Sequence, residues 1–154
     1  MDEDVGSVVS VTAVHDVGEG TVLPNRPGVY YEAEFDAVTF DPQMQEVVDG
    51  IVVEVVEFGA FVGIGPVDGL LHVSQMSDEY LSYDGENQRL ASGESSKSLT
   101  VDDSVRTRIV TKSIDERNPR DSKIGLTAKQ PGLGKHRWLE MKREETAEEA
   151  AAGE

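Results

Sequence analysis

The chain of 154 residues contains no cysteine and no long hydrophobic run. Without cysteine there are no disulfides, thiolate metal sites or cysteine nucleophiles, and an intracellular location is indicated. No apolar run reaches the ~20 residues that a membrane-spanning helix needs. Residues 2–4 are all acidic, whereas a signal peptide begins with basic residues. The sequence therefore predicts a cytoplasmic protein without a membrane anchor.

Basic residues are also scarce. Thirty acidic residues outnumber fourteen basic ones, and the net charge is −16. Residues 1–95 hold nineteen acids and two bases, whereas residues 96–129 hold five acids and eight bases. An excess of acid repels polyanions at ordinary ionic strength, but a salt-rich cytoplasm screens charge within a few ångströms. The acid excess predicts a halophilic organism, with an ordinary acidic protein as the open alternative, and the chain has one basic segment.

Residues 1–45 form the first of three segments. Two runs typical of strands, residues 7–14 and 29–40, are separated by Gly- and Pro-rich turns. Two strands are not stable alone in water. This segment therefore needs the following domain, a partner chain or sequence upstream to complete it.

Residues 46–130 form the second segment and predict a mainly β fold. Short β-branched or alternating runs at 51–64, 70–74, 105–114 and 123–127 are bounded by turn residues. Such strands are typical of a five-stranded OB-type Greek-key barrel. Residues 75–100 are a polar insert too long for a hairpin, and we interpret it as functional or mobile. In the third segment, 131–154, we expect a short helix at 136–141 and an acidic tail without stable structure.

The candidate site lies in the barrel. Strict alternation would place Phe58 and Phe61 on opposite faces, but a bulge at Gly59 and Ala60 brings both rings to one side. His72 points away from the face of its neighbours. Two aromatic rings and an imidazole beside a basic strand suit the stacking of unpaired bases. We expect single-stranded RNA to bind here. The alternative, in which both rings fill the core, does not explain why these features occur together. The predicted contacts are Phe58, Phe61, His72, Arg106, Arg108 and Lys112.

Catalytic, metal and cofactor sites are not predicted. Asp102, Asp103 and Asp115 are a possible carboxylate cluster, but no His/Glu group at ligand spacing accompanies them. His15 and His136 have no nucleophile partner in the sequence. Residues 132–134 lack the Gly-Lys-Ser/Thr ending of a phosphate-binding loop. The sequence therefore predicts a binding protein without a catalytic site of its own.

Two motifs resemble the S1-type RNA-binding domain: FGAFV at residues 58–62 and GLLHVS at residues 69–74. The resemblance implies that Phe58, Phe61 and His72 line the RNA face. It also implies that Asp115 and Lys123 are the acid and base beside the last hairpin. The intervening loop is longer here than is usual in that family.

A wider set of motifs resembles the E-prime family, the large stalk subunits of archaeal DNA-directed RNA polymerase: EFDAVTFDP at 34–42, FGAFVGIGPVDG at 58–69, SYD at 82–84 and IGLTAKQPGLG at 124–134. The resemblance implies a polymerase stalk subunit whose S1-type barrel (46–130) meets emerging RNA during initiation, elongation and termination. A partial α+β domain (1–45) would dock on the polymerase core, and residues 131–154 would extend the chain. The smaller stalk subunit, known as F, is implied as partner in a heterodimer.

Members of this family usually begin further upstream, so we expect the chain to be N-terminally short. Two alternatives remain open. One is an S1-type subunit of an RNA-degrading complex or a translation initiation factor, against which the QPGLG and FDAVTFDP segments argue. The other is an assembly protein whose barrel binds only protein.

Overall fold

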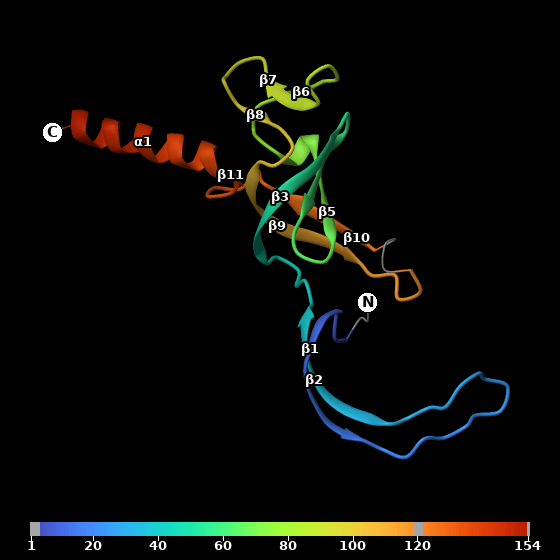
Figure 1. Ribbon diagram of the computed structural model, residues 1–154. Coiled ribbons are helices and arrows are strands. Elements are labelled where there is room, and N and C mark those ends of the chain that lie inside the picture. Colours follow the sequence, from blue (N-terminus) through green and yellow to red (C-terminus); the bar gives the residue numbers. More distant parts are fainter. Residues whose placement is uncertain (1–3, 119–121, 154) are drawn as a thin grey trace.

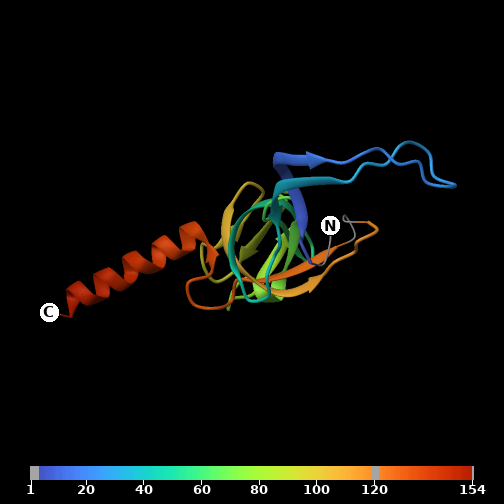
Figure 2. The same ribbon diagram turned by 90° about the horizontal axis from the view of Figure 1, so that it is seen from below.

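Strands dominate the structure, a computed structural model that describes residues 4–118 and 122–153. A two-stranded ribbon, β1 (Ser7–Val17) and β2 (Ala33–Phe40), projects from one end of a β-barrel (Figure 1). Helix α1 (His136–Ala152) leaves the barrel in another direction (Figure 2). The barrel thus carries two extensions, one at each end of the chain.

The barrel is closed by five strands. In spatial order β10, β5, β4, β3 and β9 pair in turn, and β9 pairs again with β10 to close the ring. All these pairings are antiparallel except the parallel pair of β5 and β10. The mainly β fold class with an OB-type barrel is therefore confirmed. Its strands are β3 (Val47–Val56), β4 (Gly59–Gly63), β5 (Asp68–His72), β9 (Ser104–Ser113) and β10 (Lys123–Thr127).

Strand β9 illustrates how the sequence directs side chains to the two faces. Val105, Thr107 and Ile109 are buried in the barrel, while Arg106 and Arg108 between them point outward. The two-residue strand β11 (Gly134–Lys135) adds to the edge of β9 beyond β10. Period-two alternation is what a half-buried strand requires.

The insert after β5 is folded. It comprises the 3₁₀ turn η1 (Val73–Gln75) and a three-stranded antiparallel sheet of β6 (Leu81–Asp84), β7 (Arg89–Ser92) and β8 (Ser98–Leu99). Leu81, Leu90, Leu99 and Met76 are each at most 2% exposed and join the core of the barrel. The insert therefore covers the upper end of the barrel in Figure 1.

The N-terminal ribbon is much less covered than the barrel. Strands β1 and β2 pair from Ser7 opposite Phe40 to Val17 opposite Ala33, with three irregularities in register. Phe40, at the base of the ribbon, is half-buried against the barrel core, where its ring approaches Gly65. The predicted runs correspond to β1 and β2, and residues 4–42 contain no helix in the structure.

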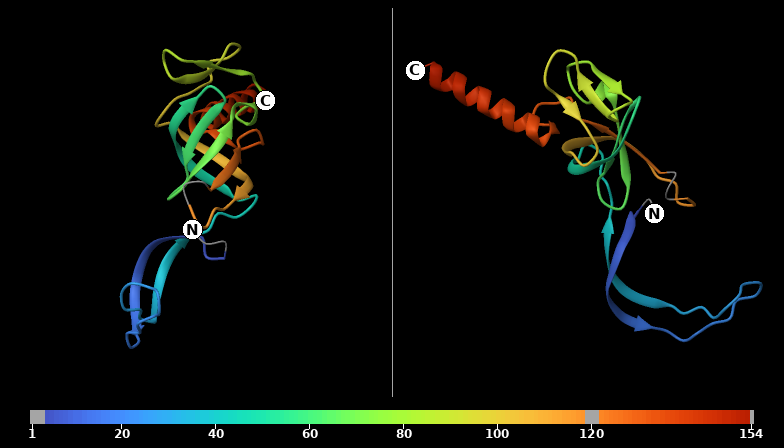
Figure 3. Two further views of the ribbon diagram at one scale, coloured as in Figure 1. Left: turned by 90° about the vertical axis from the view of Figure 1, so that its right-hand side faces the viewer. Right: turned by 45° about the horizontal axis from the view of Figure 1, so that its top comes forward.

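Helix α1 is longer than the sequence predicts. It continues through Ala152, whereas we expected a helix at 136–141 followed by a tail without stable structure. The difference has a physical reason: Ala, Glu, Lys and Arg are strong helix formers, and no Gly or Pro interrupts them before Gly153. No helix in the described residues is long and apolar enough to cross a membrane. Figure 3 shows α1 extending beyond the barrel.

Candidate nucleic-acid interface

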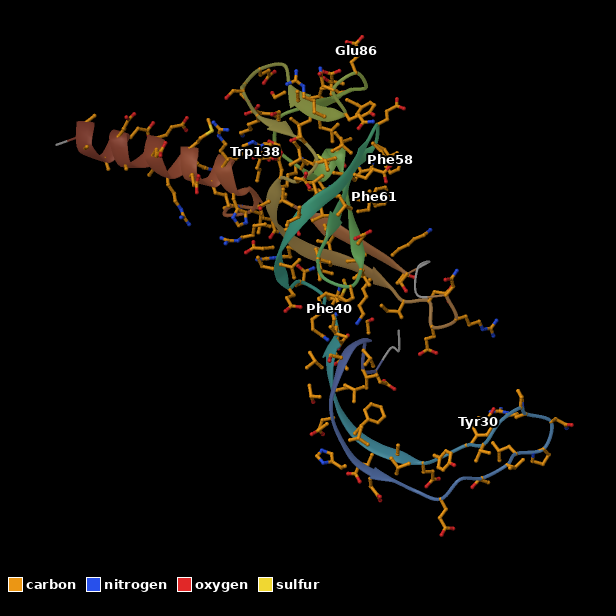
Figure 4. The ribbon with its side chains drawn as sticks, viewed as in Figure 1. Tyr30, Phe40, Phe58, Phe61, Glu86 and Trp138 are labelled. Atoms are coloured by element: carbon orange, nitrogen blue, oxygen red, sulfur yellow. The ribbon has the colours of Figure 1, made fainter. Side chains whose placement is uncertain are left out.

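Phe58 and Phe61 meet on the outside of the barrel. Phe58 occupies the two-residue turn between β3 and β4, and its side chain is 50% exposed. Its ring meets the half-buried ring of Phe61 edge to face, with centroids 6.4 Å apart and an interplanar angle of 85° (Figure 4). Both rings therefore share one face, as predicted, and the geometry is one that aromatic pairs favour.

The bulge predicted at Gly59 and Ala60 is wrong. Strand β4 pairs with β5 without interruption from Gly59 to Gly63, and the irregularity lies in β3 between Val52 and Glu54. Phe58 escapes the alternation because it belongs to the turn. Gly59 is required for a different reason: a Cβ atom there would collide with the carbonyl oxygen of Leu71.

His72 joins the two rings from the neighbouring strand. It lies opposite Gly59, while Phe61 lies opposite Leu70, so Phe61 and His72 are diagonal neighbours on the outer face. Because Gly59 has no side chain, nothing on β4 covers the imidazole from directly opposite. We call the surface formed by Phe58, Phe61 and His72 the aromatic face.

The imidazole of His72 is held by Ser74. The backbone N–H of Ser74 donates to Nδ1 at 3.2 Å, and the Ser74 hydroxyl lies 2.8 Å from the same atom. Since Nδ1 accepts, the neutral ring carries its proton on Nε2. His72 is exposed, so Nε2–H is available to donate to a phosphate or a base edge.

Two of the predicted cations, Arg106 and Lys112, are paired with carboxylates, and a third, Arg108, lies opposite Thr127 of β10. Arg106 Nε donates to Asp49 at 2.9 Å, and this bond, aided by His136, lowers the pKa of the Asp49 carboxyl. Lys112 Nζ lies 2.9 Å from Asp41, at the base of the ribbon. Arg108 points to the same outer side of β9 as Arg106, and its Nε is buried without a hydrogen-bond partner. Among the described residues, no hydrogen bond or ion pair joins these three side chains to the aromatic face.

Asp115 and Lys123 flank the loop between β9 and β10. Asp115 Oδ1 accepts from the backbone N–H groups of Arg117 and Asn118, both at 2.9 Å, which shapes the loop. Lys123 is exposed two residues before Gly125, which lies opposite Leu70. Lys123 therefore points to the same side as Phe61, roughly 13 Å from His72 along the strand direction.

Comparison with known proteins identifies the family. The S1 RNA binding domain family matches residues 41–122. The chain is 38% identical over 139 residues to DNA-directed RNA polymerase subunit Rpo7 of Saccharolobus shibatae, with 89% of this chain and 76% of that protein covered. The Rpo7 of Sulfolobus acidocaldarius is 38% identical over 138 residues, with 89% and 74% covered. The chain belongs to the Rpo7 family of RNA polymerase subunits.

The S1 domain alone is shared more widely. The polyribonucleotide nucleotidyltransferase of a Bradyrhizobium species is 35% identical over 99 residues, which cover 64% of this chain but 13% of that enzyme. The match with Rpo7 proteins extends well beyond this module. It therefore separates the chain from enzymes that carry an S1 domain as a small part.

One cation near the aromatic face of this Rpo7-family protein, Lys129, is not among the contacts predicted from the sequence. Lys129 is exposed just beyond β10, and its backbone N–H donates to Thr127 Oγ1. Thr127 Oγ1 in turn donates to Gln75 Oε1 at 3.0 Å, and the Ala128 N–H donates to the Gln75 carbonyl at 2.7 Å. Lys129 thus lies beside the segment that follows His72. The parallel pairing of β5 and β10 brings the ends of both strands together, and local sequence patterns do not reveal this pairing.

Two of the three carboxylates considered for a metal site, those of Asp103 and Asp115, have structural roles. Asp103 accepts from the backbone N–H and hydroxyl of Thr100 and lies 2.8 Å from Lys135 Nζ. Burial raises the pKa of the Asp103 carboxyl, but these donors outweigh that effect and lower it overall. Asp103 therefore fixes the turn before β9 to the start of the C-terminal extension.

Proposed function

We propose that this chain is the stalk subunit of a DNA-directed RNA polymerase and binds emerging single-stranded RNA on the aromatic face. The observation that carries the proposal is the convergence of Phe58, Phe61 and His72 on the outside of an S1 barrel in a member of the Rpo7 family. Through this contact the subunit supports initiation, elongation and termination. It contributes no catalytic group of its own.

The chemistry of the face suits single-stranded RNA. In OB folds the second and third barrel strands and the loops beside them bind oligonucleotides, and here those strands are β4 and β5. Unpaired bases stack on the two phenylalanine rings, and such stacking tolerates any base. His72 Nε2–H and the exposed Lys123 and Lys129 reach phosphates on either side.

The rest of the chain supports assembly. We propose that residues 1–45 dock on the polymerase core, that residues 46–130 are the RNA-binding barrel, and that the smaller stalk subunit completes a heterodimer. The ribbon favours docking, because its valines and Phe35 are exposed on both faces. We further propose that the protein acts in a salt-rich cytoplasm, where a net charge of −16 is screened.

Affinity purification of the tagged full chain from native extract tests the proposal. We expect the polymerase core and the smaller stalk subunit to copurify, with nascent RNA crosslinked to the chain. The triple variant F58A/F61A/H72A should retain the polymerase core but lose the RNA crosslinks. Copurification with a nuclease complex in place of the polymerase would overturn the stalk assignment. Undiminished crosslinking to the triple variant would overturn the RNA face.

A further inference from the structure

Two cavities flank helix α1 where it leaves the barrel. One has a volume of about 340 Å³ and lies between the helix, residues 128–133 and the start of the insert. The other, of about 590 Å³, lies between the helix and β9. Pro131, Gly132, Leu139 and Lys142 line both. The two cavities are therefore the sides of one groove, which we call the helix groove.

The helix groove gathers positive charge in a strongly acidic chain. Lys97, Lys129 and Lys142 line the smaller cavity, while Arg106, Lys142 and Arg143 line the larger one. Lys97 is paired with Glu79, and Arg106 with Asp49. Lys129, Lys142 and Arg143 have no ion-pair partner within 4 Å among residues 4–118 and 122–153. Unpaired cations of this kind attract a polyanion.

The same groove also contains negative charge and an aromatic wall. Asp78 and Glu145 line the smaller cavity. The ring of Trp138 packs against the barrel core, and Lys97 Nζ lies over it, 5.9 Å from the centroid. Since Lys97 occupies one face of this ring and Gly134 approaches it as well, base stacking on Trp138 is disfavoured. The groove therefore offers contacts to phosphates rather than to bases.

A chain of contacts links the aromatic face to the helix groove. His72 is held by Ser74, the adjacent Gln75 bonds to Thr127 and Ala128, and Lys129 follows directly and lines the smaller cavity. A strand that leaves the aromatic face past His72 thus meets Lys129 first. Beyond Lys129 lie Lys142 and Arg143 on the helix.

We propose that the helix groove is a second RNA-contact surface, in which Lys129, Lys142 and Arg143 bind phosphates of the strand whose bases stack on the aromatic face. This inference rests on the proposed RNA binding and adds an electrostatic extension that lengthens the site. It gives the C-terminal helix a function in ligand binding. Oligonucleotides too short to pass His72 do not reach it.

Binding of the full chain to RNA oligonucleotides of two lengths tests this surface. OB folds occupy about 4 to 16 nucleotides, so oligouridines at these two lengths separate the aromatic face from the extended site. With the long oligonucleotide, K142Q/R143Q should weaken binding and make the log–log salt slope shallower by about 1.4, since each phosphate contact on a single strand contributes about 0.7. With the short one, the variant should bind like the wild type.

Two further variants serve as matched tests. Arg137 is exposed on the same helix but lines neither cavity, so R137Q should leave both affinities unchanged. Glu145 lines the smaller cavity, so E145Q should strengthen binding of the long oligonucleotide alone. A gain in affinity cannot result from misfolding. Two results would overturn the proposal, even when F58A/F61A/H72A abolishes binding. The first is that K142Q/R143Q leaves the salt slope for the long oligonucleotide unchanged. The second is that R137Q reduces this slope as much as K142Q/R143Q does. If the wild type binds neither oligonucleotide, the proposed function fails as well.

Discussion

At the scale of single residues, the three members of the aromatic face differ in what else they support. Phe58 lies in a turn and is half exposed, whereas Phe61 is partly covered in β4. His72 is exposed and oriented by Ser74. A side chain with little packing to lose can be removed without unfolding the barrel. Phe58 and His72 therefore report on binding more cleanly than Phe61.

We predict that alanine at Phe58, Phe61 or His72 costs about 1–3 kcal/mol of RNA-binding free energy, the range for loss of one stacked base. The melting temperature of the Phe58→Ala variant should stay close to that of the wild type, because this residue is 50% exposed. Fluorescence titration with an oligonucleotide measures the affinity. Tyr80 is the matched control: it is 82% exposed on the insert, and its removal should not affect binding. Unfolding of Phe58→Ala with unchanged residual affinity would place that ring in the core.

Glu79 allows a prediction for pH. Hydrogen bonds from Ser95 and Ser92, then from Lys97, lower the pKa of its carboxyl from 4.5 to about 2. A carboxyl with a lowered pKa in the folded state stabilises the fold above its ordinary pKa, and this contribution disappears as the pH falls through the folded value. Glu79→Gln should therefore lower the free energy of unfolding at pH 7, and the difference from wild type should shrink from about pH 4.5 to 2.

Urea unfolding at a series of pH values measures this difference. Glu86→Gln is the control, because the Glu86 side chain is exposed and makes no hydrogen bond or ion pair with the described residues (Figure 4). A difference between wild type and Glu79→Gln that is constant from pH 7 to 2 would mean that the carboxylate does not hold the insert.

At the scale of elements, the sequence predicts best those strands whose side chains alternate over many residues. Strand β9 follows the period of two closely, and β10 has the predicted bounds. Turn residues also mark the reversal between β4 and β5. These features depend on neighbours in the sequence, so they can be recognised without the fold.

Other elements depend on contacts that the sequence does not display. The strands of the insert are two to four residues long, and their three buried leucines are separated by polar residues. In the same way, Arg106 and Lys112 alternate as predicted, but their partners Asp49 and Asp41 come from distant segments. The aromatic face was found because a motif marks it. The positions of Arg106 and Lys112 could not be predicted from the sequence, because long-range ion pairs determine them.

The insert is predicted to be part of the core. Leu90 in β7 is fully buried, so Leu90→Ala should lower the free energy of unfolding by about 2–5 kcal/mol, the usual cost of such a cavity. Leu23→Ala in the ribbon loop is the control: this leucine is 38% exposed and should cost much less. Chemical denaturation monitored by the fluorescence of Trp138 suits both variants. Equal small effects would show that the insert folds separately from the barrel.

At the scale of the whole molecule, charge and exposed apolar residues distinguish three surfaces of the protein. The ribbon carries few cations and many exposed valines, the barrel carries the aromatic face, and the helix groove gathers unpaired cations. A net charge of −16 makes non-specific attraction to RNA weak. In the proposed function, stacking and a few well-placed cations therefore supply most of the affinity for RNA.

The ribbon is predicted to be the least stable part of the free chain. Val8, Val11 and Val14 are each more than half exposed, and two strands without a covering layer are marginal in water. Amide hydrogens of β1 and β2 should therefore exchange fast in the isolated protein, while those of β3, β9 and β10, which pair on both sides, should be protected. Hydrogen exchange read by mass spectrometry resolves these segments in one experiment, with the barrel as internal control. Adding purified polymerase core together with the smaller stalk subunit should slow exchange in the ribbon and leave the barrel strands unchanged, because docking covers the exposed valines. Ribbon amides that are already as protected as the barrel, and that gain no protection from the polymerase, would exclude the ribbon as the docking surface. That result would not affect the proposal that the aromatic face binds RNA.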